Sequence, residues 1–286
     1  MAGIERIGIV GCGLMGSGIA EVCARAGLDV VVTETSRTAA RAGRARIGRS
    51  LDRAVSRGRL TPDQRADALS RITVSPDLGL HADRDLVVEA VAEDETAKLR
   101  VFTALDEIVQ RRDAILASNT SSIPVIRLAA ATSRPEQVVG IHFFNPVPVL
   151  RLVELVPSLL TGEETRRRAQ EFVSGPLGKE VVRAPDRAGF VVNALLVPYL
   201  LAAVRMVESG AASAEDVDRG MVLGCAHPLG PLALADLIGL DTTKAIAESM
   251  YHEYKEPLFS PPPLLARMVD AGLLGRKSGR GFHVYD

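Results

Sequence analysis

The sequence predicts an α/β protein in which a doubly wound sheet is followed by a smaller all-helical domain. Short apolar runs alternate with helical patterns over the first two thirds of the chain, which is typical of βαβ units. A glycine-rich turn joins the first apolar run to the first helical pattern, and after residue 186 the periodicity is helical. We therefore expect one domain over residues 1–186 and a second over residues 187–286.

The expected strands are nearly continuous runs of Val, Ile and Leu, as in parallel strands that helices cover on both faces. They are Arg6–Val10, Asp29–Thr33, Leu86–Glu89, Ala114–Ala117, Val138–His142 and Leu152–Val156. The expected helices between them are Leu14–Ala26, the arginine-rich segment Ser36–Leu60, Glu95–Arg112 and Glu163–Ser174. The second domain is expected to begin with a long helix that ends at Gly210. Its apolar residues recur at the three-and-four spacing of a helix face: Leu195, Leu196, Tyr199, Leu200, Ala203 and Val207.

Composition excludes several classes of function. The chain has 286 residues, a net charge of −1 and only 4% aromatic residues with no Trp, so a stacking surface for nucleic acid is not expected. The cysteines are Cys12, Cys23 and Cys225, without metal-ligand spacing, which indicates reduced thiols in a cytoplasmic protein and no metal site. No segment has the pattern of a signal peptide or a membrane span, so no membrane partner is expected.

The first candidate site is the glycine-rich turn after the first strand. Gly11, Gly13 and Gly16 form a GxGxxG motif, with Leu14 and Met15 between the last two glycines. Gly11 permits the tight turn, Gly13 lets a pyrophosphate approach the backbone, and Gly16 lets the helix pack closely on the strand. This arrangement predicts a Rossmann-like dinucleotide-binding domain.

An acidic residue at the end of the second strand selects the cofactor. Glu34 directly follows Asp29–Thr33. A carboxylate at this position accepts hydrogen bonds from the ribose hydroxyls and repels a 2′-phosphate, which predicts NAD(H) over NADP(H). Arg37 follows closely and weakens this preference.

A histidine at a strand end is the leading catalytic candidate. His142 ends an apolar run, Asn145 follows it in a proline-containing turn, and Glu154 is an acid inside the next apolar run. Because an unpaired buried carboxylate is costly, we expect Glu154 to pair with the His142 imidazole. The pair would hold one tautomer for general base chemistry. The alternative places Glu154 on a solvent-exposed edge strand.

Small polar side chains follow the strand Ala114–Ala117. Two interpretations stay open for the run from Ser118 to Ser122. Ser122 precedes Ile-Pro and a helical stretch, so the run could cap a helix. It could equally place Asn119 near a nicotinamide and Ser121 near a substrate oxygen.

Basic residues are concentrated in one segment. Between Ser36 and Leu60 there are eight arginines and one acid, Asp52. Such a run is usually a solvated helix face, but it also suits a phosphate-bearing ligand.

Five motifs together resemble the 3-hydroxyacyl-CoA dehydrogenase family, and within it the monofunctional 3-hydroxybutyryl-CoA dehydrogenases. They are GxGxMGxGIA, SNTSS, HFFNPVPVLRLVE, GFVVN and PPPLLARMVDAGLLGRKSGRGF, and they occur in order along nearly the whole chain. The resemblance implies NAD(H)-dependent interconversion of (S)-3-hydroxyacyl-CoA and 3-ketoacyl-CoA in fatty acid metabolism, with a short acyl chain. It also implies a homodimer formed through the C-terminal domain.

The resemblance assigns roles to residues of this chain. His142 corresponds to the general base and Glu154 to the carboxylate that orients it, and Ser121 and Asn193 correspond to residues that hold the substrate oxygens. Asn119, Glu93 and Lys98 line the cofactor, and Asn145 is a further candidate substrate contact. Ser50 and Arg57 fall in the helical hairpin that contacts coenzyme A. Arg57 departs from the family, which commonly has lysine there, so this contact is less secure.

Other functions remain open at this point. The same chemistry could act on an acyl-carrier-protein thioester or on 3-hydroxyadipyl-CoA, and a dinucleotide-binding protein without catalysis is the non-enzyme alternative. A 3-hydroxyisobutyrate dehydrogenase is a weaker match, because those enzymes use a lysine on the long second-domain helix. Here the helix that begins at Asn193 offers only Arg205 as a basic residue.

Overall fold

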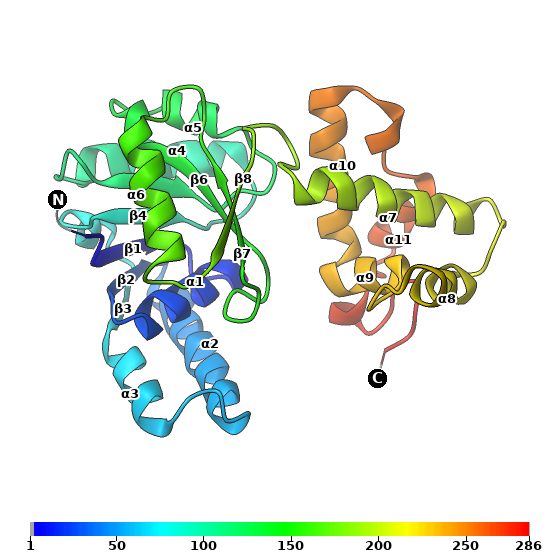
Figure 1. Cartoon of the computed structure of the whole chain (residues 1–286), viewed down its shortest axis with the longest axis horizontal. Coiled ribbons are helices and arrows are strands. Elements are labelled where there is room, and N and C mark those ends of the chain that lie inside the picture. The colour runs from blue at the N-terminus through cyan, green and yellow to red at the C-terminus, as the bar shows by residue number, and fades with distance from the viewer. Residues whose placement is uncertain (1–2, 286) are drawn as a thin grey trace. The chain divides into compact units, whose positions relative to one another are not determined.

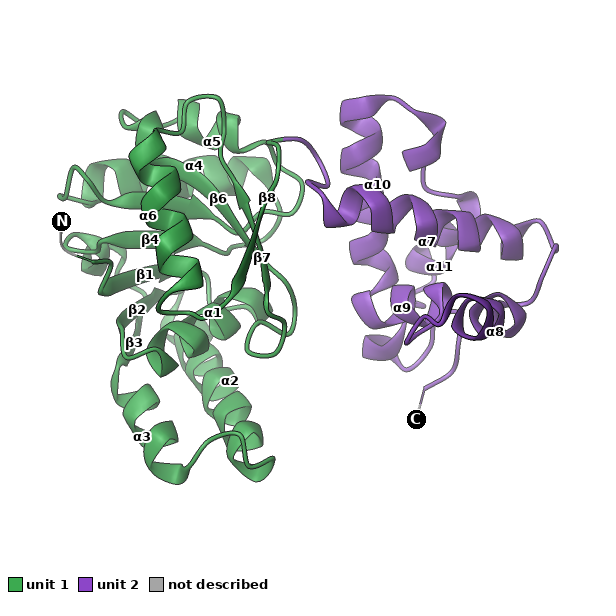
Figure 2. Ribbon diagram, in the orientation of Figure 1, with its two compact units in different colours: residues 1–186 green, residues 187–286 purple. Residues whose placement is uncertain are grey.

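The computed structural model describes residues 3–285 and divides the chain into two compact units. The first comprises residues 1–186 and the second residues 187–286. Figure 2 shows them in different colours. Within the described residues, no helix combines the length and the hydropathy needed to cross a membrane.

An eight-stranded sheet forms the centre of the first unit (Figure 1). Its order is β3-β2-β1-β4-β5-β6-β7-β8, and every neighbouring pair is parallel except β6 and β7, which are antiparallel. The strands are β1 Arg6–Val10, β2 Asp29–Thr33, β3 Ile72–Ser75, β4 Leu86–Glu89, β5 Ile115–Ser118, β6 Val138–Phe143, β7 Leu152–Val156 and β8 Glu180–Arg183. The predicted α/β class is confirmed.

Helices cover both faces of this sheet. They are α1 Leu14–Arg25, α2 Arg37–Ser56, α3 Pro62–Ser70, α4 Glu95–Ile108, α5 Val125–Ala130 and α6 Glu163–Ser174, with short 3₁₀ turns η1 Leu78–His81 and η2 Pro135–Gln137. On one face, α1, α2 and α6 share a core with the strands that includes Ile9, Ile141, Ile19 and Phe172. Gly140 faces the other way, because a Cβ atom there would meet Val125 of α5. Residues of β6 therefore alternate between the two helical layers.

The structure corrects several expected elements. Strands β3 and β8 and helix α3 were not predicted, and α4 ends at Ile108 rather than Arg112. Helix α5 is the helical stretch that was expected after Ile-Pro. β3 and β8 are the two edge strands of the sheet. Only Ile72 of these two strands is buried and most residues of β8 are exposed, so they lack the continuous apolar run of the central strands.

The second unit is helical. It contains α7 Val192–Glu208, α8 Ala214–Cys225, α9 Pro231–Ile238, α10 Leu240–Tyr254 and α11 Pro263–Asp270, with 3₁₀ turns η3 Pro257–Phe259 and η4 Arg276–Ser278. Leu200 and Val204 of α7 lie in the core of this unit. The predicted long helix is α7, and Leu195 of its apolar face is 75% exposed rather than part of this core.

Candidate active site

The glycine turn between β1 and α1 has the geometry that a dinucleotide-binding turn requires. Gly11 has φ of +96°, where a side chain would be strained, and a Cβ atom at Gly16 would lie 1.9 Å from the Gly11 carbonyl oxygen. Nothing lies within 4 Å of the position of a Cβ atom at Gly13, so its backbone can be approached from outside. The exposed side chain of Leu14 begins α1 beside this opening.

Glu34 lies against the same turn. Its Oε1 accepts a hydrogen bond from the Cys12 backbone N–H at 2.7 Å. Arg46 of α2 donates to the Cys12 carbonyl oxygen, so one arginine of the basic segment is fixed at the turn. Burial, followed by the nearby Glu34 charge, raises the pKa of the Cys12 thiol to about 11. Cys12 is therefore a neutral packing residue rather than a reactive thiol.

His142 and Glu154 form a buried pair at the carboxyl end of β6. The two residues are direct cross-strand partners in the antiparallel β6–β7 ladder, so their side chains project from the same face. His142 Nδ1 lies 2.7 Å from Glu154 Oε2, and Glu154 is fully buried. β7 lies between β6 and β8, so the alternative of an exposed edge position for Glu154 is wrong.

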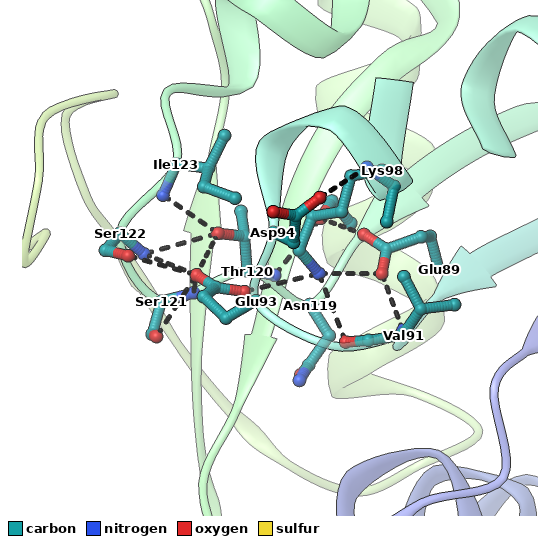
Figure 3. A network of polar contacts seen from close by, with 12 residues as sticks. Glu89, Val91, Glu93, Asp94, Lys98, Asn119, Thr120, Ser121, Ser122 and Ile123 are labelled. Atoms are coloured by element: carbon teal, nitrogen blue, oxygen red, sulfur yellow. Dashed lines mark hydrogen bonds and ion pairs between the residues drawn. The ribbon is translucent and has the colours of Figure 1, made fainter. Parts of the chain in front are cut away.

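Asn119 links the end of β5 to the end of β6. Its Oδ1 accepts a hydrogen bond from the Phe143 backbone N–H at 2.9 Å, directly after the catalytic candidate His142. Its own backbone N–H donates to the Glu89 carbonyl oxygen. In Figure 3 the side-chain nitrogen of Asn119 points away from the neighbouring polar network. The candidate residues on β5 and β6 are thus held side by side.

A buried lysine joins two carboxylates at the carboxyl end of β4. Lys98 of α4 donates from Nζ to Glu89 Oε1 at 2.7 Å and lies 3.2 Å from Glu93 Oε2. Glu89 also accepts hydrogen bonds from Val91 N–H and from the Ser118 hydroxyl. Glu89 and Lys98 are both almost completely buried, so this is a paired charge with several satisfied hydrogen bonds.

Glu93 links the Lys98 ion pair to the loop that follows β5 (Figure 3). Its Oε1 accepts hydrogen bonds from the Ser121 and Ser122 backbone N–H groups at 2.9 and 3.1 Å, and from the Thr120 hydroxyl. Burial alone would raise the pKa of Glu93, but the Lys98 charge and these hydrogen bonds together lower it below its ordinary value. Glu93 therefore stays charged and fixes the loop that carries Ser121.

The helix-cap interpretation of this loop is wrong. Asp186 supplies the cap of α5, because its two carboxylate oxygens accept hydrogen bonds from Val125 N–H at 2.6 Å and Ile126 N–H at 2.8 Å. No side chain at the N-terminus of α5 makes this contact. The hydroxyls of residues 120–122 and the backbone N–H groups of Ser121 and Ser122 donate to Glu93 instead.

The structure groups some predicted site residues and leaves others separate. It joins His142 to Glu154, and it joins Glu93, Lys98 and Ser121 in one network. Asn145 is exposed just beyond β6, Ser50 lies within α2, and Arg57 directly follows the last residue of that helix. Asn193 lies in the first turn of α7, in the second unit. Glu89, Ser118 and Thr120 were not predicted, although Glu89 ends an apolar run as Glu34 does.

The chain matches two family profiles that together cover almost all of it. Residues 6–187 match the NAD binding domain of 3-hydroxyacyl-CoA dehydrogenase. Residues 189–285 match the C-terminal domain of the same family. The resemblance that the five motifs predict is confirmed.

Known proteins match over the full length. A 3-hydroxybutyryl-CoA dehydrogenase of Mycobacterium tuberculosis is 59% identical over 282 residues, covering 99% of each chain. The crystal structure of M. tuberculosis FadB2 is similar with a TM-score of 0.99 and 58% identity over 100% of both chains. That of the (S)-3-hydroxybutyryl-CoA dehydrogenase PaaH1 of Ralstonia eutropha has a TM-score of 0.92 and 46% identity over 99% of both.

Proposed function

The chain belongs to the 3-hydroxyacyl-CoA dehydrogenase family, and from this premise we propose that it interconverts (S)-3-hydroxyacyl-CoA and 3-ketoacyl-CoA with NAD(H). The observation that carries the proposal is the buried pair of His142 and Glu154 at the carboxyl edge of the sheet. Ligands of open α/β sheets bind beyond this edge. Relatives named 3-hydroxybutyryl-CoA dehydrogenase match the full chain, which supports a short acyl group.

The residues of the glycine turn fit the cofactor. The open approach to Gly13 and the adjacent N-terminus of α1 suit a pyrophosphate, and the Glu34 carboxylate suits a ribose. When bound, NAD⁺ would accept a hydride from C3 of the hydroxyacyl group, and NADH would donate a hydride in the reverse direction. Glu93, Lys98 and Asn119 are proposed to line the nicotinamide side of the site.

His142 is proposed to move the proton. Because the Glu154 carboxylate can only accept a hydrogen bond, the proton of the neutral imidazole lies on Nδ1. Nε2 is then the nitrogen that takes the 3-hydroxyl proton during oxidation and returns it to the ketone oxygen during reduction. Glu154 stabilises the imidazolium that forms between these steps, and it keeps the ring in one tautomer.

Ser121, Asn145 and Asn193 are proposed to hold the oxygen atoms of the acyl thioester. The network through Glu93 supports this role for Ser121, because two backbone hydrogen bonds fix the loop on which it lies. Ser50 and Arg57 are proposed to contact the coenzyme A part of the substrate. Replacing any one of these residues by Ala should raise KM for the thioester while the fold stays intact.

A panel of substrates and cofactors tests the proposed reaction. We expect consumption of NADH with acetoacetyl-CoA, slower consumption of NADPH because of Glu34, and lower activity with a six-carbon ketoacyl-CoA that carries a distal carboxylate. Acetoacetyl thioesters of coenzyme A and of acyl carrier protein should be compared at equal concentration. Preference for the acyl-carrier-protein thioester would contradict the proposed carrier, and NADH binding without turnover would contradict catalysis.

We also propose that residues 187–286 form a homodimer interface. Several large apolar side chains of the second unit are exposed, among them Leu195 at 75%, Leu223 at 72% and Val284 at 76%. Exposed apolar surface of this kind is typical of an interface. Light scattering after size exclusion should give twice the chain mass, and Leu195→Asp with Leu223→Asp should give the single-chain mass. A wild-type monomer would contradict the proposal.

A further inference from the structure

The loop between β6 and β7 has few hydrogen bonds of its own. It comprises residues 144–151, and the two strands that it joins carry His142 and Glu154. Asn145, a proposed substrate contact, lies at its beginning. Inside the loop, two backbone N–H groups donate to the Pro146 carbonyl oxygen. A loop with so few internal bonds depends on contacts from other segments to keep one conformation.

The side chain of Lys179, which directly precedes β8, supplies such contacts. Its Nζ donates to the carbonyl oxygen of Val147 at 2.8 Å and to that of Leu150 at 2.7 Å. Among the described residues, no backbone N–H donates to either of these two oxygens. Lys179 therefore satisfies two loop carbonyl groups that the rest of the backbone does not.

The backbone of Lys179 is itself held firmly. Its N–H donates to the Val173 carbonyl oxygen at the end of α6, at 3.1 Å. The next residue, Glu180, donates from its N–H to the Arg151 carbonyl oxygen at 2.9 Å and continues the pairing of β7 with β8. The ammonium group is thus carried by a rigid element, as a group that positions another segment should be.

The ammonium group of Lys179 is buried without a counter-charge. The residue is 8% exposed. Burial, and then the nearby Arg25 charge, lowers the pKa of Lys179 below its ordinary value, and no described carboxylate offsets these effects. A buried charge without an ionic partner costs stability, so packing alone does not explain a lysine here.

Helix α1 packs against the same loop. A Cβ atom at Gly18 would lie 2.9 Å from the Val147 Cβ, so a larger residue there would displace the loop. In Figure 1 the loop that precedes β7 lies beside α1. Val147, which is buried, is therefore held by both α1 and Lys179. Asn145 precedes Val147 by two residues, which limits their separation to about 7 Å.

We propose that Lys179 is a positioning residue for thioester recognition, because its two hydrogen bonds hold the β6–β7 loop in the conformation that presents Asn145 to the substrate. The inference rests on the proposed function, in which Asn145 contacts the acyl thioester. Lys179 acts through the loop and does not touch the substrate. His142 is held separately by its cross-strand pairing with Glu154, so loss of the clamp affects binding more than proton transfer.

The test is Lys179→Met, which keeps a long side chain but cannot donate a hydrogen bond. We expect KM for acetoacetyl-CoA to rise about 10-fold, kcat to change less than about threefold, and the Kd for NADH to stay near wild type. KM for the acetoacetyl thioester of pantetheine should rise by the same factor, because the loop acts at the acyl end. A lysine that only attracted phosphates would affect the coenzyme A thioester alone.

A double-mutant cycle tests whether Lys179 acts through Asn145. The variants are Lys179→Met, Asn145→Ala and their combination. We expect the combination to have the same KM as Asn145→Ala alone, because the clamp has nothing to position once the amide is removed.

A matched control separates this effect from a general loss of stability. Near the amino end of β6, Arg134 is a half-buried cation that also donates to two backbone carbonyl oxygens, those of Asp106 and Arg111. Arg134→Met should lower the unfolding midpoint and leave the KM for both thioesters unchanged. If Lys179→Met does not fold, Lys179→Gln takes its place in every comparison. Its amide can still donate to one of the two oxygens, so a smaller rise in KM is expected.

Either of two results would overturn the inference. The folded Lys179 variant could keep the wild-type KM for both thioesters, or its effect on KM could add to that of Asn145→Ala. If the wild type turned over no thioester, the proposed function would fail instead. Hydrogen exchange of the backbone N–H groups in residues 144–151 would then decide whether Lys179 holds the loop. Faster exchange in the Lys179 variant than in Arg134→Met supports the clamp, and equal exchange refutes it.

Discussion

At the scale of single residues, the site is built from carboxylates that end or interrupt apolar strands. Glu154 stands inside an apolar run, and the cost of burying its charge predicted the His142 partner that the structure contains. Glu89 has the same signal at the end of β4, but its partner Lys98 comes from a helix nine residues later. The pair of His142 and Glu154 in neighbouring strands was predictable from the sequence. The ion pair of Glu89 with Lys98 of α4 was not.

Replacing Glu154 by Gln tests the orienting role of this carboxylate. Gln can donate as well as accept, so the proton of the imidazole is no longer confined to Nδ1 and the imidazolium loses its counter-charge. We expect kcat to fall by about 10²-fold or more, within the range for general acid–base catalysis, while the Kd for NADH stays near wild type. Fluorescence titration and steady-state kinetics measure the two quantities. An equal loss in both would argue against the dyad.

Replacing Lys98 by Met tests the buried network. The change leaves Glu89 fully buried without its cation, and breaking such a pair costs about 3–5 kcal/mol of unfolding free energy. The double variant Lys98→Met/Glu89→Gln removes the unpaired charge and should recover part of this loss. Urea unfolding of the two variants gives both values. Wild-type stability in Lys98→Met would contradict the account of this network.

At the scale of elements, the β1–α1 turn shows how two glycines serve different purposes. A Cβ atom at Gly16 would meet the Gly11 carbonyl oxygen at 1.9 Å, whereas Gly13 has open space in the same direction. Gly16 is therefore required by the packing of the protein itself, whereas the open space at Gly13 supports its proposed role in the approach of the cofactor.

The pair Gly16→Ala and Gly13→Ala separates folding from cofactor binding. Ala usually stabilises a helix relative to Gly by about 1 kcal/mol, but at Gly16 we expect the clash to reverse the sign and lower the unfolding midpoint. At Gly13 we expect near-wild-type stability and weaker NADH binding. Thermal unfolding and NADH titration of both variants test this. A stable Gly16→Ala variant with normal NADH affinity would refute the packing argument.

The central elements were predictable from sequence, whereas the edges and caps depend on distant parts of the chain. Buried strands such as β1 and β2 are continuous apolar runs, and their predicted bounds are confirmed. β8 is a mostly exposed run that pairs only with β7, at the edge of the sheet. Asp186 caps α5 from about sixty residues away, and no local pattern indicates such a contact.

At the scale of the whole molecule, a buried histidine links stability of the first unit to pH. His81 is fully buried, and its Nε2 forms a hydrogen bond of 2.7 Å with the Thr33 hydroxyl. Its Nδ1 has no hydrogen-bond partner among the described residues. Burial, with a smaller effect of Arg84, lowers its pKa from 6.5 to about 4. The ring is therefore neutral in the folded protein at neutral pH.

This shift predicts a loss of stability in mild acid. Below pH 6.5 the unfolded chain binds a proton that folded His81 does not bind until about pH 4, so the free energy of unfolding falls across that window. The full contribution is about 3 kcal/mol. His81→Gln, which can keep a hydrogen bond to Thr33, should show a smaller fall than wild type in urea unfolding between about pH 7 and pH 4.5. Equal falls would contradict the assignment.

The central claim is that His142, held by Glu154, transfers the proton in a dehydrogenase reaction on an acyl-CoA thioester. It is tested most directly by measuring NADH oxidation with acetoacetyl-CoA for the wild type and for His142→Ala, after unfolding curves show that both are folded. We predict turnover by the wild type and a rate lower by about 10²- to 10⁴-fold in the variant. A folded His142→Ala variant that turns over acetoacetyl-CoA near the wild-type rate would contradict the claim.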